Sequence, residues 1–268
     1  LNVSRSYLQS DGNVKKISSH ITKKVADRLE EIFKEDRAAY EAKWDDLKLF
    51  VDYGSISNEK FWERAEKFAL VKDVDGNYFT YEEYQKAVEE KQKNKDGKTV
   101  YLYTTDPEQQ WGYIEEAKGR GYSVLQMTGQ LDAHLINFLE QKLKDVQFAR
   151  VDADTLDRLI EKGDERKVAL SETEQSSLVG VMTGALGEKR AQFSVSLEDL
   201  GAEGLPAVVT QSEFMRRMRD MAQMSPQYNM FANFPDRVNI VLNTAHPLVE
   251  RLTREAQEAL GGQLAALD

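Results

Sequence analysis

Apolar residues in the first third of the chain recur at every third or fourth position, which is the spacing of one face of an α-helix. The first stripe comprises Val14, Ile17, Ile21, Val25, Leu29, Ile32 and Phe33. The second comprises Tyr40, Trp44, Leu47 and Val51 and is broken at Gly54 and Ser55; the third comprises Phe61, Trp62, Ala65, Phe68 and Ala69. The pattern predicts a helical bundle in which the aromatic side chains pack against one another.

A turn and a short helix are expected to follow the bundle. Residues 73–77 read Asp-Val-Asp-Gly-Asn, and Thr80 with Glu83 forms the capping-box pattern that opens a helix through Val88. The alternating carboxylates resemble a calcium loop. However, Tyr84 stands at the twelfth position, where an EF-hand needs glutamate, and the glycine comes too early. We therefore predict a turn and no metal site.

Beyond a charged segment at residues 91–98, short apolar runs alternate with helical patterns. Strands are expected at residues 100–103, 122–127 and 146–151, and helices at residues 106–118 and 131–143. The first of these helices would begin at Asp106 and Pro107, as an N-cap followed by a first-turn proline. A strand–helix–strand–helix–strand order predicts a small unit with parallel strands.

The last hundred residues contain both helical patterns and short apolar runs typical of strands. We expect a polar connector at residues 152–174 and a helix at 178–186 that is ended by Gly187. Strands at 193–196 and 207–210 are expected to pair around the turn at 201–206. A helix at 212–224, a strand at 239–242 and a final helix that begins at Pro247 would follow. The predicted fold is mixed α/β: a helical bundle (1–95), a small βαβαβ unit (96–170) and an α+β C-terminal domain (171–268).

Composition excludes several classes of function. The chain has 268 residues, a formal net charge of −10 and no cysteine. An acidic chain repels phosphate backbones, so we expect no nucleic-acid partner. The absence of thiols excludes disulfides and thiolate metal sites and suits a reducing cytosol. No apolar run approaches the roughly 20 residues that span a bilayer, and no secretory leader precedes Leu1, so we expect a cytoplasmic fragment of a longer protein.

Six short stretches share the order of motifs in one protein family. Residues 1–5 (Leu-Asn-Val-Ser-Arg) with Leu8-Gln9 are similar to a catalytic-loop motif, residues 100–104 to "IYYIT", 121–125 to "KGYEVL", 131–132 to "IDE", 205–210 to "TPAIVST" and 242–248 to "LNPDHPL". The chain thus resembles the bacterial branch of the heat-shock protein 90 chaperone family. It departs from the family at Ser6, where many members carry glutamate, and at residues 242–246.

The resemblance implies that the chain covers the latter part of a middle domain and most of a C-terminal domain, ending before a dimerisation hairpin. The parent would be an ATP-driven, homodimeric, cytosolic clamp that binds unfolded or partly folded client proteins. ATP and Mg²⁺ would be held by the parent's own N-terminal domain. We therefore expect no cofactor on this chain, and no ATP hydrolysis by it alone.

The same resemblance assigns catalytic residues. Arg5 would reach the γ-phosphate of ATP from the neighbouring domain, since a guanidinium carries permanent charge in a planar fork. Asn2 and Gln9 would order the same loop. The other interpretation of Arg5 is an exposed arginine near a chain end.

A methionine-rich helix and one histidine are candidate client-binding residues. The helix carries Phe214, Met215, Met218, Met221 and Met224. Methionine adapts to varied partners, so an exposed stripe would suit binding of partly unfolded proteins, although the same residues could fill a core. By resemblance, His134 occupies a position where the family has a client-contacting aromatic. A surface histidine is the alternative.

Two other classes of function remain open. Parallel α/β units bind ligands at the C-terminal ends of their strands, so the chain could be a self-contained enzyme with a small-molecule site. Thr104, Thr105, Asp106 and Thr128 would line that site. A purely structural scaffold is the third possibility.

Overall fold

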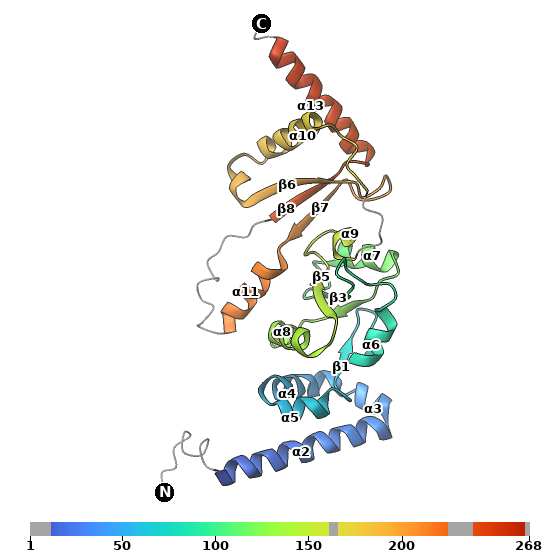
Figure 1. The fold of residues 1–268 in the computed structure, drawn as a ribbon, viewed down its shortest axis with the longest axis vertical. Helices are drawn as coiled ribbons and strands as arrows, with labels where there is room; N and C mark the ends of the chain where they lie inside the picture. Colours follow the sequence, from blue (N-terminus) through green and yellow to red (C-terminus); the bar gives the residue numbers. More distant parts are fainter. Residues whose placement is uncertain (1–11, 161–165, 225–237, 266–268) are drawn as a thin grey trace.

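The structure is a computed structural model that describes residues 12–160, 166–224 and 238–265. Three parts follow one another along its longest axis: a helical part, a three-stranded parallel sheet with its helices, and a second three-stranded sheet at the C-terminal end (Figure 1). The mixed α/β fold class is confirmed. The domain boundaries drawn from the sequence stay predictions.

The helical part comprises α2 (Gly12–Glu35), α3 (Arg37–Glu41), α4 (Trp44–Ser57) and α5 (Glu59–Ala65). Polar caps separate these helices: the Asp36 side chain accepts from the Ala39 N–H, and the Asn58 side chain accepts from the Phe61 N–H. Their core is aromatic, as expected, because Tyr40, Trp44, Phe61 and Trp62 are buried together.

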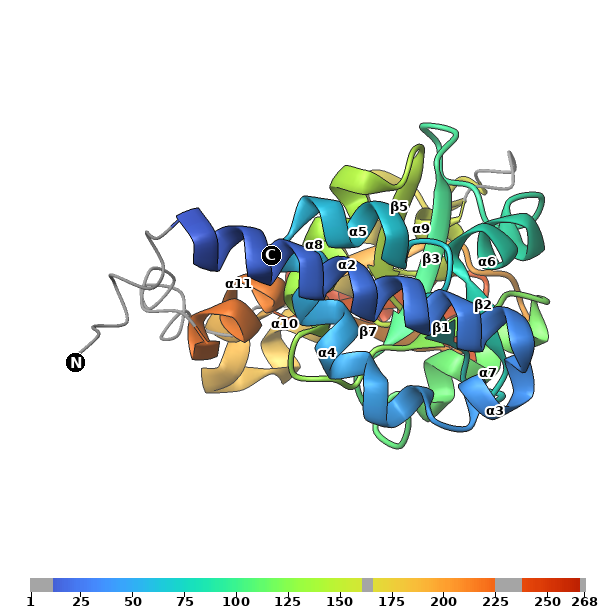
Figure 2. The same ribbon diagram turned by 90° about the horizontal axis from the view of Figure 1, so that it is seen from below.

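The apolar stripe of α2 is only partly covered. Leu29, Ile32 and Phe33 pack against the core, whereas Ile17, Ile21 and Val25 remain largely exposed. Both views show the N-terminal end of α2 projecting beyond α4 and α5, so no described helix lies over that end (Figures 1 and 2).

Gly54 does not break the second helix, and the sequence prediction was wrong there. Gly54 and Ser55 lie inside α4. A Cβ atom at Gly54 would lie 2.8 Å from Cε1 of Phe61, so the glycine lets the aromatic ring of α5 lie directly on α4. Close helix packing, and not helix termination, explains this glycine.

A short hairpin leads from the bundle to the sheet. β1 (Leu70–Lys72) and β2 (Tyr78–Thr80) pair antiparallel; these strands were not predicted. The predicted turn between them is confirmed, because Oδ1 of Asp73 accepts from the N–H groups of Asp75 and Asn77 at 2.9 and 2.8 Å. The capping box of Thr80 and Glu83 is also present and opens α6 (Tyr81–Val88).

The central sheet has the order β4–β3–β5 with both pairs parallel, as predicted. Its strands and helices are β3 (Thr99–Thr104), α7 (Trp111–Gly119), β4 (Val124–Gln126), α8 (Asp132–Lys142) and β5 (Val146–Arg150). α7 begins later than predicted. The Asp106 carboxylate accepts from the N–H groups of Glu108 and Gln109, which holds residues 106–110 in a turn before the helix.

The C-terminal part comprises α9 (Leu156–Leu159), α10 (Glu172–Ala185), the 3₁₀ helix η1 (Gly187–Gln192), β6 (Phe193–Glu198), β7 (Ala207–Gln211), α11 (Glu213–Met224), β8 (Val238–Asn243) and α13 (Pro247–Ala265). α10 ends where predicted: it stops at Ala185, and Gly187 takes the left-handed φ of +55°. α10 and α13 lie together on one side of the sheet (Figure 1). In the described parts of the chain, no helix combines the length and apolarity needed to cross a bilayer.

The predicted pairing of the strands at residues 193–196 and 207–210 was wrong. The sheet order is β6–β8–β7, so β8 lies between the two strands that were expected to pair. β8 supplies the most buried apolar residues of this sheet, Val241 and Leu242, which favours the central position. Asn243, at the end of β8, also holds the turn at residues 199–204 through the Leu200 N–H and the Gly201 carbonyl.

Candidate functional site

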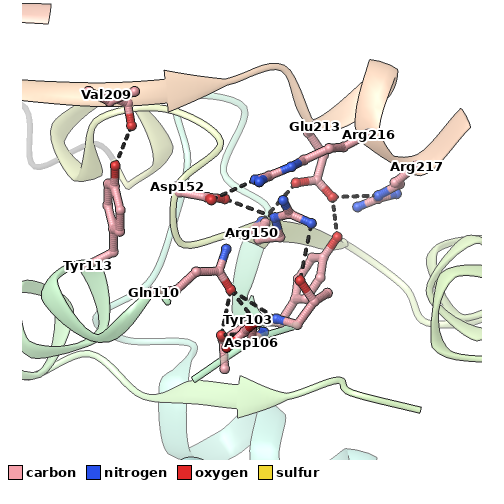
Figure 3. Close-up of polar contacts among 12 residues, drawn as sticks. Tyr103, Asp106, Gln110, Tyr113, Arg150, Asp152, Val209, Glu213, Arg216 and Arg217 are labelled. Carbon is pink, nitrogen blue, oxygen red and sulfur yellow. Dashed lines mark hydrogen bonds and ion pairs between the residues drawn. The ribbon is translucent and has the colours of Figure 1, made fainter. Parts of the chain in front are cut away.

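A network of charged residues joins α11 to the C-terminal ends of β3 and β5 (Figure 3). Glu213, the first residue of α11, is at its centre. One carboxylate oxygen accepts from the Tyr103 hydroxyl at 2.5 Å and from Nε of Arg217 at 2.6 Å, and the other accepts from the backbone N–H of Arg150 at 2.9 Å. One side chain therefore ties α11 to two strands of the central sheet.

Arg217 extends the network to α8. Its guanidinium donates to the Glu140 carboxylate at 2.7 Å and to the Phe148 carbonyl at 2.8 Å, and its side chain is only 11% exposed. Burial lowers the pKa of Arg217. The hydrogen bond to Glu140 and the charge of Glu213 outweigh that effect, so the pKa is raised and the group stays cationic.

A second cluster lies beside the first. Asp152 accepts from Nε of Arg150 at 2.9 Å and from Nη1 of Arg216 at 2.6 Å, and its backbone carbonyl accepts from the Gln211 N–H at 3.0 Å. Nη1 of Arg150 also donates to the Thr105 hydroxyl at 3.2 Å. Across the two clusters, three arginines face three carboxylates, so the junction between the central sheet and α11 is polar and close to neutral.

A cavity of about 410 Å³ opens beside this junction, at the C-terminal ends of the parallel strands. Its wall contains two arginines and one carboxylate, Arg150, Arg217 and Asp132, together with polar residues that include Thr105 and Thr128. Met127, Ala133 and Ile136 are its apolar members. Open parallel sheets bind ligands at this edge. Of the four residues proposed for an enzyme site, Thr105 and Thr128 reach the cavity. Thr104 is buried and donates to Gln110, and Asp106 caps a turn.

A buried ionic cluster connects the first turn of α8 with α4. Lys48 lies between Asp52, at 2.7 Å, and Asp132, with which it also forms an ion pair. The second carboxylate oxygen of Asp132 accepts from the Gly129 N–H at 2.8 Å and fixes the loop that precedes α8. Burial raises the pKa of Asp52 from 3.8 to about 6, despite the opposing effect of Lys48.

The residues predicted for ATP-linked chemistry cannot be placed, because Asn2, Arg5 and Gln9 lie outside the described residues. The candidate client-binding residues fall on two neighbouring helices. His134 is half-buried on α8, while on α11 Phe214 is 61% exposed and Met215 and Met218 are half-buried. Met221 and Met224 belong to α11, and their side chains are outside the described set. α8 and α11 contact each other, so both candidate regions lie in one part of the molecule.

Sequence reasoning missed the charged side of α11. It did not predict that Glu213, Arg216 and Arg217 would contact the central sheet, Asp152 and α8. Asp152 was assigned to a polar connector. One signal was available: Arg150 follows the apolar residues Phe148 and Ala149 in an expected strand, and a buried arginine requires partners.

Comparison with known proteins gives one consistent result. The family described as "Hsp90 protein" matches residues 1–264. The chaperone protein HtpG of Porphyromonas gingivalis is 53% identical over 268 residues, which is 100% of this chain and 39% of that protein. The protein of that name from Bacteroides fragilis is 45% identical with the same coverage, and that of Bdellovibrio bacteriovorus is 26% identical over 96% of this chain. The chain therefore spans about two fifths of the length of these relatives.

Proposed function

The chain belongs to the Hsp90 protein family, and we propose that it supplies the client-binding surface and the ATPase-activating arginine of a molecular chaperone. The parent would be a cytosolic homodimer driven by ATP and Mg²⁺ bound to an N-terminal domain. Its partners would be unfolded or partly folded proteins. Support comes from the relatives, which are named chaperone proteins, and from the Leu1-to-Gln9 stretch that resembles the family's catalytic loop.

The observation that carries the client-binding proposal is the way α11 docks. Glu213, Arg216 and Arg217 form hydrogen bonds and ion pairs with Tyr103, Asp152 and Glu140. On the same helix, Phe214 remains 61% exposed and Met218 is half-buried. An exposed aromatic with flexible thioethers binds varied apolar segments. The helix is held in place by ionic contacts, so apolar residues of α11 are left for a partner.

We expect Phe214→Glu combined with Met218→Glu to weaken the holding of an unfolded protein. A charge on this surface opposes contact with apolar segments, while the docking contacts of α11 stay intact. Suppression of aggregation of a heat-unfolded reporter enzyme, measured by light scattering, should fall by roughly threefold or more, with a change in melting temperature of only about 2 °C.

Leu248→Glu is the matched control, since Leu248 is 63% exposed at the start of α13. It should leave aggregation suppression unchanged. A loss of many degrees in the Phe214 and Met218 variant would show that these side chains fill a core, and equal effects of both variants would remove the case for a surface on α11.

Arg5→Ala should lower ATP hydrolysis by roughly tenfold or more in the longer protein that contains this chain, because a cation supplied to the γ-phosphate acts mainly in the transition state. The fall should appear in kcat, with little change in KM for ATP. Arg28→Ala, which removes an exposed arginine paired with Glu31 on α2, is the control. An unchanged kcat in the Arg5 variant would contradict the proposed role.

A further inference from the structure

We propose that the cavity between β3, β4 and α8 is a binding site for a carboxylate that is carried next to an apolar group. The cavity, the residues of its wall and the hydrogen bonds of Arg150 carry this inference. It does not rest on the chaperone proposal, because a ligand could occupy the cavity whether or not α11 binds clients.

Arg150 is the residue that would bind the carboxylate. It is only 6% exposed and lines the cavity. Its Nε is used by Asp152 and its Nη1 by Thr105, but Nη2 donates to no residue that the structure describes. A buried guanidinium that lines a cavity and has a nitrogen without a described partner offers a charged donor to an anion such as a carboxylate.

Two features beside Arg150 favour the same kind of ligand. Thr128, on the rim, has an exposed hydroxyl and a backbone N–H that donate to no described residue. The cavity also faces the N-terminal turn of α8, an 11-residue helix whose dipole presents partial positive charge there. Both offer hydrogen-bond donors or partial positive charge to an anion.

The other charges around the cavity are already neutralised. Arg217 is occupied by Glu213, Glu140 and the Phe148 carbonyl. Asp132, the one carboxylate in the wall, is held by Lys48 and by the Gly129 N–H. A carboxylate bound to Nη2 of Arg150 would therefore not be repelled by an unpaired anion among the described residues of the wall.

Part of the cavity wall is apolar. Ala133 is small and half-buried and contributes apolar surface to the cavity, whereas Met127 and Ile136 lie in the wall almost fully buried and expose little of their side chains. A volume of about 410 Å³ is within the range of small-molecule sites. The combination suits a small acid with a branched or aromatic group, or the C-terminal residue of a peptide.

N-acetyl-leucine and N-acetyl-leucinamide separate charge recognition from apolar contact, because the two molecules differ only in the carboxylate. We expect the acid to bind the 268-residue chain with a millimolar dissociation constant in isothermal titration, and the amide to bind at least about tenfold more weakly. Equal binding of acid and amide, or no binding of either at millimolar concentrations, would overturn the proposal.

Two variants locate the site. Ala133→Leu reduces the free volume of the cavity without removing a charged group, and Arg150→Gln removes the guanidinium; each should weaken binding of the acid by roughly tenfold. Ala87→Leu makes the same change on the exposed face of α6 and should leave binding unchanged. If Arg150→Gln proves unstable by circular dichroism, Ala133→Leu still decides: unaltered binding in that variant would place the site elsewhere.

The source of the carboxylate is distinguished with a tripeptide, Ala-Ala-Leu, in free and C-terminally amidated forms. Binding of the free peptide at least as tight as that of N-acetyl-leucine identifies a chain terminus as the ligand. Binding of the acid alone identifies a free small acid. Both results support recognition of a carboxylate beside an apolar group, whereas equal binding of the free and amidated peptides contradicts it.

Discussion

Arg217→Met should lower the free energy of unfolding by about 3–5 kcal/mol, because it removes one partner from a buried ionic network. Glu140 and Glu213 would each lose a short contact, and the Phe148 carbonyl would lose its side-chain donor. Methionine replaces much of the aliphatic part of the arginine side chain. The decrease in the free energy of unfolding therefore comes more from the lost charge and hydrogen bonds than from lost volume. Urea unfolding followed by circular dichroism measures the effect.

Hydrogen exchange should locate the damage at α11 and β5, where the Arg217 contacts converge. Arg251→Met is the matched control: Arg251 pairs with Glu255 on α13, and both side chains are more than half exposed. An exposed pair of this kind contributes little to stability, because water screens the two charges. Similar losses in both variants would mean that the ionic contacts of α11 contribute no more than an ordinary surface pair.

The fold of the central part was predictable because its sequence signals are local. Short apolar runs separated by helical patterns gave the parallel unit, and Thr80 with Glu83 gave the start of α6. These signals depend on neighbours within a few residues, so no tertiary information was needed. The turn at Asp73 was predictable for the same reason.

Predictions failed where the deciding contact joins distant residues. β8 separates β6 from β7, although it follows β7 in the chain, and local turn signals at residues 201–206 favoured a simple hairpin. Gly54 was assigned to a helix end, yet its role is to accommodate the Phe61 ring. In both cases the local preference was overridden by packing against another element.

The candidate site also contains residues that the sequence predicts and contacts that it does not predict. The apolar residues of α11 were identified from their types and spacing, and Phe214 is exposed in the structure. The docking contacts of Glu213, Arg216 and Arg217 span more than sixty residues of sequence, and neither spacing nor composition indicates such partners. Similarly, a cavity is formed by loops that follow different strands, so only the fold brings its residues together.

Lys48→Met should cost about 3–5 kcal/mol near neutral pH, since it leaves two buried carboxylates without their shared cation. The side chains of Asp52 and Asp132 are each only 3% exposed. The Gly129 N–H would still serve Asp132, but Asp52 would lose the one ion pair that opposes its desolvation. The expected result is a weaker contact between α4 and α8, visible as faster hydrogen exchange in both helices.

The stability lost in Lys48→Met should increase with pH, whereas a loss caused by poorer packing would not depend on pH. Burial raises the pKa of Asp52 from 3.8 to about 6, so the folded protein binds a proton that the unfolded chain releases. Stability from this group is therefore greatest at low pH and falls as pH rises from about 4 through about 6. Without Lys48 the folded pKa rises further, and the fall extends to higher pH. Unfolding free energies at about pH 5 and about pH 8 should differ more in the variant than in the wild type.

Two further variants test whether the unpaired carboxylates cause the loss of stability in Lys48→Met. Adding Asp52→Asn to Lys48→Met removes one unpaired charge, so it should recover part of the stability at the higher pH and flatten the pH dependence. Lys86→Met, which breaks the exposed pair of Lys86 and Glu82 on α6, should leave the free energy of unfolding almost unchanged at either pH. If Lys48→Met loses the same stability at both pH values and the double variant gains nothing, the two carboxylates do not depend on Lys48, and the contact between α4 and α8 is held by apolar packing alone.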